Sequence, residues 1–182
     1  MPLLMLRDLP RFECLLEASE RYPALEPSAF NAFLHLLRTG DLVFGAENEF
    51  LHSKALSQGR FTVLMLLNRA CSEPKTPAEL ADEAGVTRAT ITGLLDNLER
   101  DGMVVREMSP EDRRTVLVRL TDQGQRCVDG LLPHYCRRVS AIMEPLTESE
   151  RNTMVQLLQK VQQGLSPADS VAPTPAPAIA SV

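Results

Sequence analysis

The sequence predicts a mainly α-helical protein that carries one small β-hairpin. Apolar residues recur at helical spacing along most of the chain, and the period changes to that of strands only in 103–108 and 115–120. Capping signals mark two helix starts, because Thr76 and Thr147 are each followed three residues later by a glutamate. At 182 residues the chain has the length of one medium domain with tails.

A long N-terminal helix is expected after a short extension. Residues 1–27 form this predicted extension, in which 1–19 are a short helix with Pro10 near its start and a proline-marked linker follows. Ser28 is the expected N-cap of the long helix, assigned to 28–56, whose apolar residues lie on two stripes. Two stripes indicate a helix that is packed on two sides, against its own domain and against a partner chain.

The order of elements in 57–120 indicates a winged helix-turn-helix. After one helix that begins at Ser57, a short helix over 76–85 ends at a glycine, and a second helix over 87–102 follows. Two helices around a glycine turn are typical of a helix-turn-helix, and the β-hairpin directly after them supplies the wing. The sequence therefore predicts a winged helix-turn-helix module with further helices on both sides of it.

The second helix of this module has one apolar side and one polar side built from small residues. Its apolar residues, spaced i, i+3, i+4 and i+7, are Ile91, Leu94, Leu95 and Leu98. The opposite side carries Ala89, Gly93 and Asp96, flanked by Arg88, Thr90, Thr92 and Asn97. Small residues let a helix backbone approach base edges in a major groove, and arginine or threonine can reach bases or phosphates. The alternative is an ordinary solvated face, which more often carries long charged pairs four residues apart.

The hairpin tip, with the sequence SPEDRR, is strongly charged. Arg113 and Arg114 are adjacent on a protruding turn, where they could enter a minor groove or hold phosphates. Asp112 is expected to fix one of these arginines by pairing with it. The alternative is a charged turn that serves only solubility.

Two helices and a polar tail are expected after the hairpin. Thr121 is the expected cap of a long helix that contains Pro133 and is bent by it. A last helix stops near Gly164, so that the two helices occupy 121–165. Residues 166–182 are rich in proline and alanine, which predicts a disordered tail.

Composition and charge limit the function classes. A formal net charge of −5 and a pI of about 5.3 argue mildly against a nucleic-acid binder. Because 57–126 hold ten basic and eleven acidic residues, affinity for DNA would depend on a few placed arginines and strongly on salt. No nucleophile–base pair, phosphate loop or metal-ligand cluster stands out, which argues against an enzyme, a cofactor or a metal site. Four cysteines without a CxxC pair, no bilayer-length apolar run and no signal peptide predict a cytoplasmic protein.

The stretch 78–124 resembles the DNA-binding core of the MarR family, the multiple antibiotic resistance regulators. The matching pieces are DNLERDG at the end of the second helix, SPEDRR at the wing tip and LTDQG at the start of the next helix. The resemblance implies an obligate homodimer whose interface is built by 28–56 and 121–165. It also implies that each subunit places one helix in the major groove of a pseudo-palindromic operator in double-stranded DNA, with the wings at the minor groove.

Carried over by position, the implied DNA contacts are Thr76, Arg88, Ala89, Thr90, Thr92, Arg113 and Arg114. Where many members of the family have an arginine after the threonines of the recognition helix, this chain has Gly93. This difference removes one base contact and moves more of the readout to Arg88 and to the wing.

The resemblance further implies a repressor that is released from its operator by a small, aromatic and anionic ligand. The implied pocket lies between the DNA-binding module and the dimerisation helices, and its expected residues are Phe33, Leu37, Arg38, Phe44, Arg60, Phe61 and Leu64. Apolar residues of this kind are also typical of a plain core, and either arginine could instead form a structural salt bridge.

Two other functions stay open at this point. A cysteine-based oxidant sensor is one, although Cys14 lies in the N-terminal segment and not in the first long helix, where the family's hydroperoxide sensors place theirs. A winged-helix module that binds proteins and not DNA is the other. The arginine-bearing wing tip and the polar helix face favour DNA binding over this second alternative.

Overall fold

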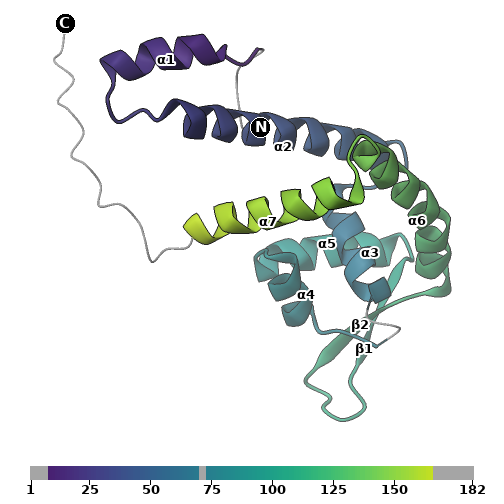
Figure 1. Cartoon of the computed structure of the whole chain (residues 1–182). Helices are drawn as coiled ribbons and strands as arrows, with labels where there is room; N and C mark the ends of the chain where they lie inside the picture. Colours follow the sequence, from purple (N-terminus) through teal and green to yellow (C-terminus); the bar gives the residue numbers. More distant parts are fainter. Residues whose placement is uncertain (1–7, 70–72, 166–182) are drawn as a thin grey trace, which may run out of the picture. The chain divides into compact units, whose positions relative to one another are not determined.

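The computed structural model describes residues 8–69 and 73–165, and these form two compact units (Figure 1). The first unit ends at Val128 and the second begins at Asp129. Two predictions fall outside the described residues: the structure of the first seven residues of the N-terminal extension, and the disordered tail over 166–182.

The first unit opens with two helices that pack against each other, α1 (Phe12–Arg21) and α2 (Pro27–His52). The prediction that Ser28 is the N-cap of α2 is wrong. Glu26 caps the helix instead, because its carboxylate accepts the amide N–H groups of Ser28 at 3.2 Å and Ala29 at 2.5 Å. Pro27 can be the first helical residue since it has no N–H to satisfy and its φ is already helical.

The winged helix-turn-helix is confirmed. Its elements follow in the predicted order: α3 (Gln58–Arg69), α4 (Pro77–Ala84), α5 (Arg88–Arg100), β1 (Val104–Met108) and β2 (Val116–Leu120). Thr76 and Glu79 form the predicted capping box at the start of α4. Gly85 ends α4 with φ +64°, a left-handed conformation that a glycine adopts without steric cost. This turn redirects the chain into α5.

The hairpin is a two-stranded antiparallel sheet in which Val104 faces Leu120 and Met108 faces Val116. Each strand starts one residue later than predicted. Met103 still donates its N–H to the Leu98 carbonyl at 2.9 Å, and Thr115 donates to the Asp112 carbonyl at 2.8 Å, so both belong to the preceding turns. At the base of the hairpin, Lys75 forms an isolated bridge with Val118, which ties the segment before α4 to the wing.

The core of the module lies between its three helices and the hairpin base. α3 contacts α4, α5 and β2, and α5 contacts β1. Three of the four predicted inward residues of α5 are fully buried, and Leu94 is half-buried against Gly59. The buried apolar side chains of the module include Phe61, Leu64, Leu80, Ile91, Leu95, Leu98, Val104 and Val118.

The last two helices are α6 (Asp122–Met143) and α7 (Glu148–Gly164). Thr121 caps α6 as predicted, since its hydroxyl accepts the Gly124 N–H at 3.0 Å. In the second unit, Thr147 and Glu150 form the predicted capping box at the start of α7. Within the described residues, no helix combines the length and the apolar composition needed to cross a lipid bilayer.

Candidate nucleic-acid interface

The exposed face of α5 begins at its first residue. Thr87 caps the helix by accepting the N–H of Thr90 at 3.2 Å, so the helical turns start at Arg88. The apolar side of α5 is turned into the core, which leaves the other side in solvent. The predicted DNA contacts of this helix all lie on the exposed side: Arg88, Ala89, Thr90 and Thr92.

The threonine hydroxyls of α5 are oriented by the helix itself. The hydroxyl of Thr92 donates to the Arg88 carbonyl at 2.9 Å, and the hydroxyls of Thr87 and Thr90 bond each other at 2.9 Å. Because its proton is used within the helix, Thr92 presents oxygen lone pairs and a methyl group to solvent. Such a side chain can accept a hydrogen bond from an adenine or cytosine amino group, or contact a thymine methyl group.

Small residues leave the middle of this face without protruding side chains. Apart from Gly93, its chain neighbours and the nearby backbone of α5, no described heavy atom lies within 4 Å of the position that a Cβ would take at Gly93, and Ala89 is exposed one turn earlier. With so little side chain above it, the backbone of α5 can lie close to another surface. A major groove, which admits one α-helix, is a surface of that shape.

Thr76 is engaged in the cap of α4. Its hydroxyl accepts the Glu79 N–H at 3.2 Å and donates to the Glu79 carboxylate at 2.8 Å, and its own N–H donates to the same carboxylate at 2.7 Å. Its predicted role as a DNA contact therefore stays a prediction, because its polar groups already serve the helix start.

The wing tip is held by short side-chain bonds. Ser109 accepts two amide N–H groups of the turn, and Asp112 accepts the Arg114 N–H at 2.9 Å and the Thr115 hydroxyl at 3.0 Å. The expectation that Asp112 pairs with an arginine side chain is wrong, because its carboxylate closes the backbone turn. This arrangement stiffens the tip and leaves the guanidinium groups of Arg113 and Arg114 to solvent.

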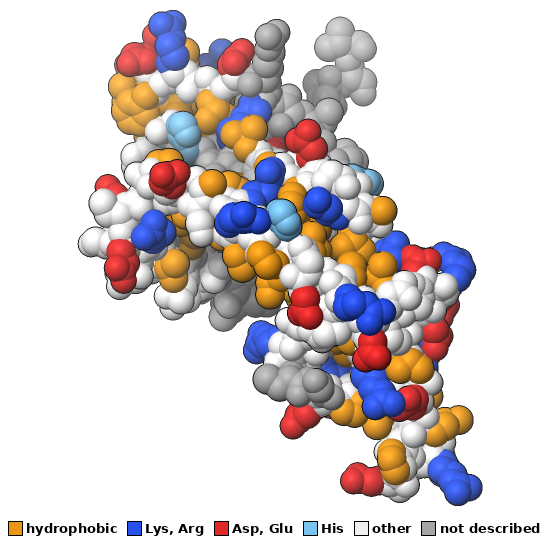
Figure 2. Space-filling view, turned by 90° about the vertical axis from the view of Figure 1, so that its right-hand side faces the viewer, with side chains coloured by type: hydrophobic (Ala, Val, Ile, Leu, Met, Phe, Trp, Pro, Cys, Tyr) orange, Lys and Arg blue, Asp and Glu red, His pale blue; other side chains and the backbone are white. Residues whose placement is uncertain are grey.

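Charge at the interface is set by which arginines have partners. Several basic residues of the module form ion pairs, among them Arg60 with Asp101, Lys75 with Glu83, Arg106 with Asp96 and Glu99, and Arg119 with Glu107. Within the described residues, Arg88, Arg113 and Arg114 form no ion pair. Figure 2 shows charged side chains of both signs at the lower end of the molecule, where the hairpin tip lies.

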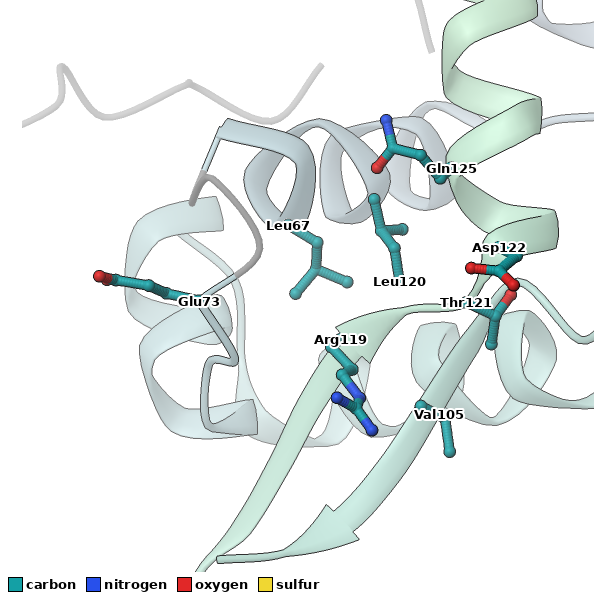
Figure 3. A pocket seen from close by; sticks show the side chains of 8 residues that line it. All are labelled: Leu67, Glu73, Val105, Arg119, Leu120, Thr121, Asp122 and Gln125. Atoms are coloured by element: carbon teal, nitrogen blue, oxygen red, sulfur yellow. The ribbon is translucent and has the colours of Figure 1, made fainter.

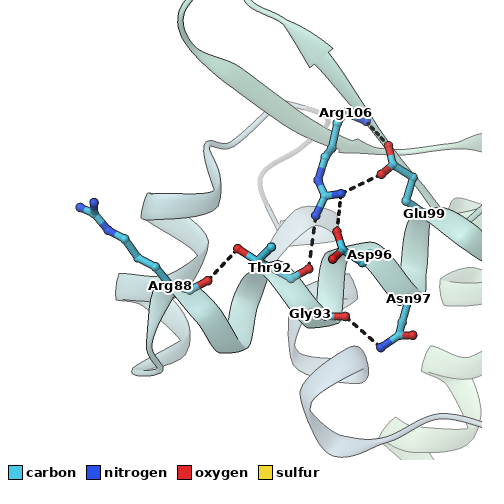
Figure 4. A network of polar contacts seen from close by, with 7 residues as sticks. All are labelled: Arg88, Thr92, Gly93, Asp96, Asn97, Glu99 and Arg106. Atoms are coloured by element: carbon cyan, nitrogen blue, oxygen red, sulfur yellow. Dashed lines mark hydrogen bonds and ion pairs between the residues drawn. The ribbon is translucent and has the colours of Figure 1, made fainter.

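Arg106 on β1 joins the wing to α5 (Figure 4). Its guanidinium donates to Asp96 Oδ1 at 2.7 Å, to Glu99 Oε2 at 2.8 Å and to the Thr92 carbonyl at 3.3 Å. Its backbone N–H donates to Glu99 Oε1 at 3.2 Å. Sequence reasoning missed this network, although two carboxylates three residues apart near a helix end, followed by a strand arginine, are a detectable signal.

The MarR family model matches residues 56–116, which contain α3, α4, α5 and β1. The HTH-type transcriptional repressor YetL of Bacillus subtilis (strain 168) is 34% identical over 161 residues, which cover 88% of this chain and 96% of that protein. The chain belongs to the MarR family. At this level the predictions of the fold and of a DNA-binding transcription regulator are confirmed.

Two solved structures support this placement of the MarR-family chain. A MarR-family regulator from Rhodococcus sp. RHA1 is 28% identical with a TM-score of 0.61, over 73% of this chain and 93% of that one. CouR from Rhodococcus jostii RHA1, whose structure contains p-coumaroyl-CoA, is 28% identical with a TM-score of 0.60, over 75% of this chain and 92% of that one.

The effector residues predicted from the MarR resemblance fall into different environments. Phe33 and Phe44 are exposed on α2, and Leu37 is half-buried. Phe61 and Leu64 belong to the core of the module, with exposed fractions of 5% and 0%. An effector pocket that these residues share, together with Arg38, stays a prediction.

Arg60, also predicted as an effector residue, has a structural partner. Its guanidinium pairs with Asp101, just after the end of α5, and one of its nitrogens lies 4.0 Å from the Met103 sulfur. The contact joins the start of α3 to the end of α5. This geometry favours the salt-bridge alternative for Arg60 over a role in holding a ligand carboxylate.

A pocket of about 500 Å³ lies at the base of the wing (Figure 3). It is lined by residues of α3, both strands and the start of α6, and by Glu73 from the segment before α4: Leu67, Glu73, Val105, Arg119, Leu120, Thr121, Asp122 and Gln125. Its walls carry charges of both signs, and none of the predicted effector residues lines it. The arginine in its wall is already paired with Glu107 on the neighbouring strand.

Proposed function

We propose that this MarR-family protein is a homodimeric repressor that binds a pseudo-palindromic operator in double-stranded DNA and is released by a small aromatic, anionic ligand. The observation that carries the proposal is the exposed face of α5, together with a wing tip whose two arginines form no ion pair with any residue in 8–69 or 73–165. The description of YetL as a transcriptional repressor supports repression rather than activation.

The proposed contacts divide between bases and phosphates. α5 enters the major groove, where Arg88, Thr90 and Thr92 reach base edges or phosphates and Ala89 meets a thymine methyl group. Arg113 and Arg114 reach the minor groove or the phosphates beside it, which their exposure on a stiff turn supports. An unpaired guanidinium loses no protein partner when it binds a phosphate, so these arginines contribute their full charge to binding.

The exposed apolar residues of the outer helices support a dimer. On α2 these residues are Phe30, Phe33, Leu36, Leu42, Val43 and Phe44. On α7 they are Val155, Leu157 and Val161. Large apolar side chains gathered on one helix are typical of a protein interface. A second copy that covers them would bring two α5 helices to successive turns of one DNA duplex.

Enrichment from a library of random duplexes tests the DNA-binding proposal. The full chain should enrich an inverted repeat whose half-site centres lie about 10 base pairs apart, since a twofold dimer presents two equal reading helices. An Arg88→Ala/Thr92→Ala variant should enrich this repeat less. Recovery of no common motif would contradict the proposal, and recovery of a single half-site would contradict the dimeric part of it.

Release by a ligand is tested on the same enriched duplex. The bound p-coumaroyl-CoA in CouR supports an aromatic ligand with an anionic group. Titration of aromatic carboxylates and their thioesters should identify a compound that lowers affinity for the duplex, whereas matched aliphatic acids should not. If aliphatic and aromatic acids act alike, the proposed ligand class is wrong even when DNA binding holds.

A further inference from the structure

One polar side chain of β1, Arg106, links the wing to α5 through hydrogen bonds and ion pairs. Arg106 bonds three positions of α5 with its guanidinium and a fourth time with its own backbone N–H, all at 2.7–3.3 Å. The side chain is 24% exposed, so these bonds are partly shielded from water. A planar guanidinium that spans two carboxylates and a carbonyl fixes direction as well as distance.

The position of Arg106 on the strand makes it an anchor. Val104 is buried in the core and Val105 is half-buried, but Glu107 and Met108 beyond Arg106 are exposed. Along β1, Arg106 is therefore the outermost residue that is held against α5. The stiff tip with Arg113 and Arg114 continues from this point, so a change of angle at Arg106 moves both arginines relative to the reading face of α5.

We propose that Arg106 is a positioning residue for sequence-specific binding: it holds the wing at the angle at which α5 and the wing tip engage the same operator half-site, without touching DNA. This inference rests on the proposed function. Both of its carboxylate partners lie on α5, and Asp96, with its side chain 58% exposed, is on the side that faces DNA. The guanidinium is thus turned toward these carboxylates and not toward a phosphate.

The test compares the affinity for the enriched duplex with that for an unrelated duplex of equal length. Arg106→Ala should lower the affinity for the enriched duplex by about tenfold or more, the usual effect of losing hydrogen bonds to charged groups. It should lower the affinity for the unrelated duplex by much less. Arg119→Ala is the matched control. Arg119 is the arginine of β2, and its partner Glu107 lies on β1 of the same hairpin, so its loss should leave the angle to α5 unchanged.

Glu99→Gln gives a second test that does not depend on the stability of the Arg106 variant. It removes a negative charge near DNA, so simple electrostatics predicts tighter binding to both duplexes. Because an amide has one acceptor oxygen, the variant loses one of the two hydrogen bonds between Arg106 and Glu99, and this weaker anchor instead predicts a lower ratio of specific to non-specific affinity. Glu107→Gln makes the same charge change on the wing without touching α5, and it should leave the ratio as in the wild type.

Three results would overturn the inference. Arg106→Ala could weaken both duplexes alike and lower the salt slope by about two, which is the signature of one phosphate contact per protomer. The ratio of specific to non-specific affinity could be unchanged in both Arg106→Ala and Glu99→Gln. Alternatively, Arg119→Ala could lower this ratio as much as Arg106→Ala does. The wild type's own preference for the enriched duplex tests the proposed function, so the two failures are distinguishable.

Discussion

Glu79 and Thr76 show how one pair of residues contributes to the stability of the winged helix-turn-helix module. Hydrogen bonds from the Thr76 N–H and then from its hydroxyl lower the pKa of Glu79, and Lys75 adds a smaller effect in the same direction. A carboxylate whose pKa is lower in the folded than in the unfolded chain stabilises the fold at pH values above its ordinary pKa of 4.5. This contribution is lost as the pH falls through the lowered pKa.

Glu79→Gln is expected to remove this pH dependence while it keeps the cap, because glutamine can still accept the hydrogen bonds. Near neutral pH the variant should be less stable than the wild type by well under about 1 kcal/mol, since the carboxylate is exposed and screened by water. The difference should vanish in acid below the lowered pKa of Glu79. Urea unfolding over a pH series measures it, with Glu111→Gln on the wing tip as the charge-matched control. An equal difference at every pH would contradict the assignment.

At the scale of elements, the start of α6 is fastened to the turn between α5 and β1. The Thr121 hydroxyl donates to the Gly102 carbonyl at 2.6 Å, and Gln123 donates to the Asp101 carbonyl at 3.0 Å. At Gly124 a Cβ would lie 2.0 Å from the Met103 carbonyl oxygen, so helix and turn are in direct backbone contact. The C-terminal end of α5 is therefore held against the first turn of α6 through this turn.

Gly124→Ala is expected to destabilise the protein by about 1–3 kcal/mol or more, because a methyl group there requires the backbone to move apart. Gly93→Ala is the matched control, since it also lies inside a helix but has open space. There alanine should stabilise the fold by about 0.5–1 kcal/mol through its higher helix propensity. Urea unfolding of both variants checks this. A Gly124→Ala protein as stable as the wild type would show that α6 does not lie this close to the turn.

Local signals in the sequence predicted most elements, and the exceptions have physical causes. The caps at Thr76, Thr121 and Thr147 depend on residues three positions away, so the sequence is enough to find them. The prediction failed at Ser28 because the side chain of Glu26 accepts the N–H groups of Ser28 and Ala29, so the helix begins earlier, at Pro27.

Contacts between elements were harder to predict from the sequence. The exposed face of α5 follows from its helical period, so its predicted residues lie together. The Arg106 network and the close approach of Gly124 depend on how strands and helices meet in space. Asp112 shows the same limit, since its choice between a guanidinium and the backbone depends on the shape of the turn.

At the scale of the whole molecule, a chain with a net negative charge can bind DNA only if some positive side chains are exposed at the interface and are not neutralised by nearby carboxylates. The net charge is −5. Ion pairs hold many carboxylates of the module against Arg60, Lys75, Arg106 and Arg119, while Arg88, Arg113 and Arg114 stay available on its exposed face. Because few charges then carry the attraction to phosphates, each should have a measurable share of the salt dependence of binding.

The salt dependence of affinity for the enriched duplex tests this claim most directly. The logarithm of the binding constant should fall steeply with the logarithm of salt concentration for the wild type. In Arg113→Ala/Arg114→Ala the slope should be smaller by about three to four, for two lost phosphate contacts in each protomer. Arg11→Ala/Arg21→Ala, which removes the same charge at α1, should keep the wild-type slope. A nearly flat wild-type slope, or an unchanged slope in the wing variant, would contradict the account.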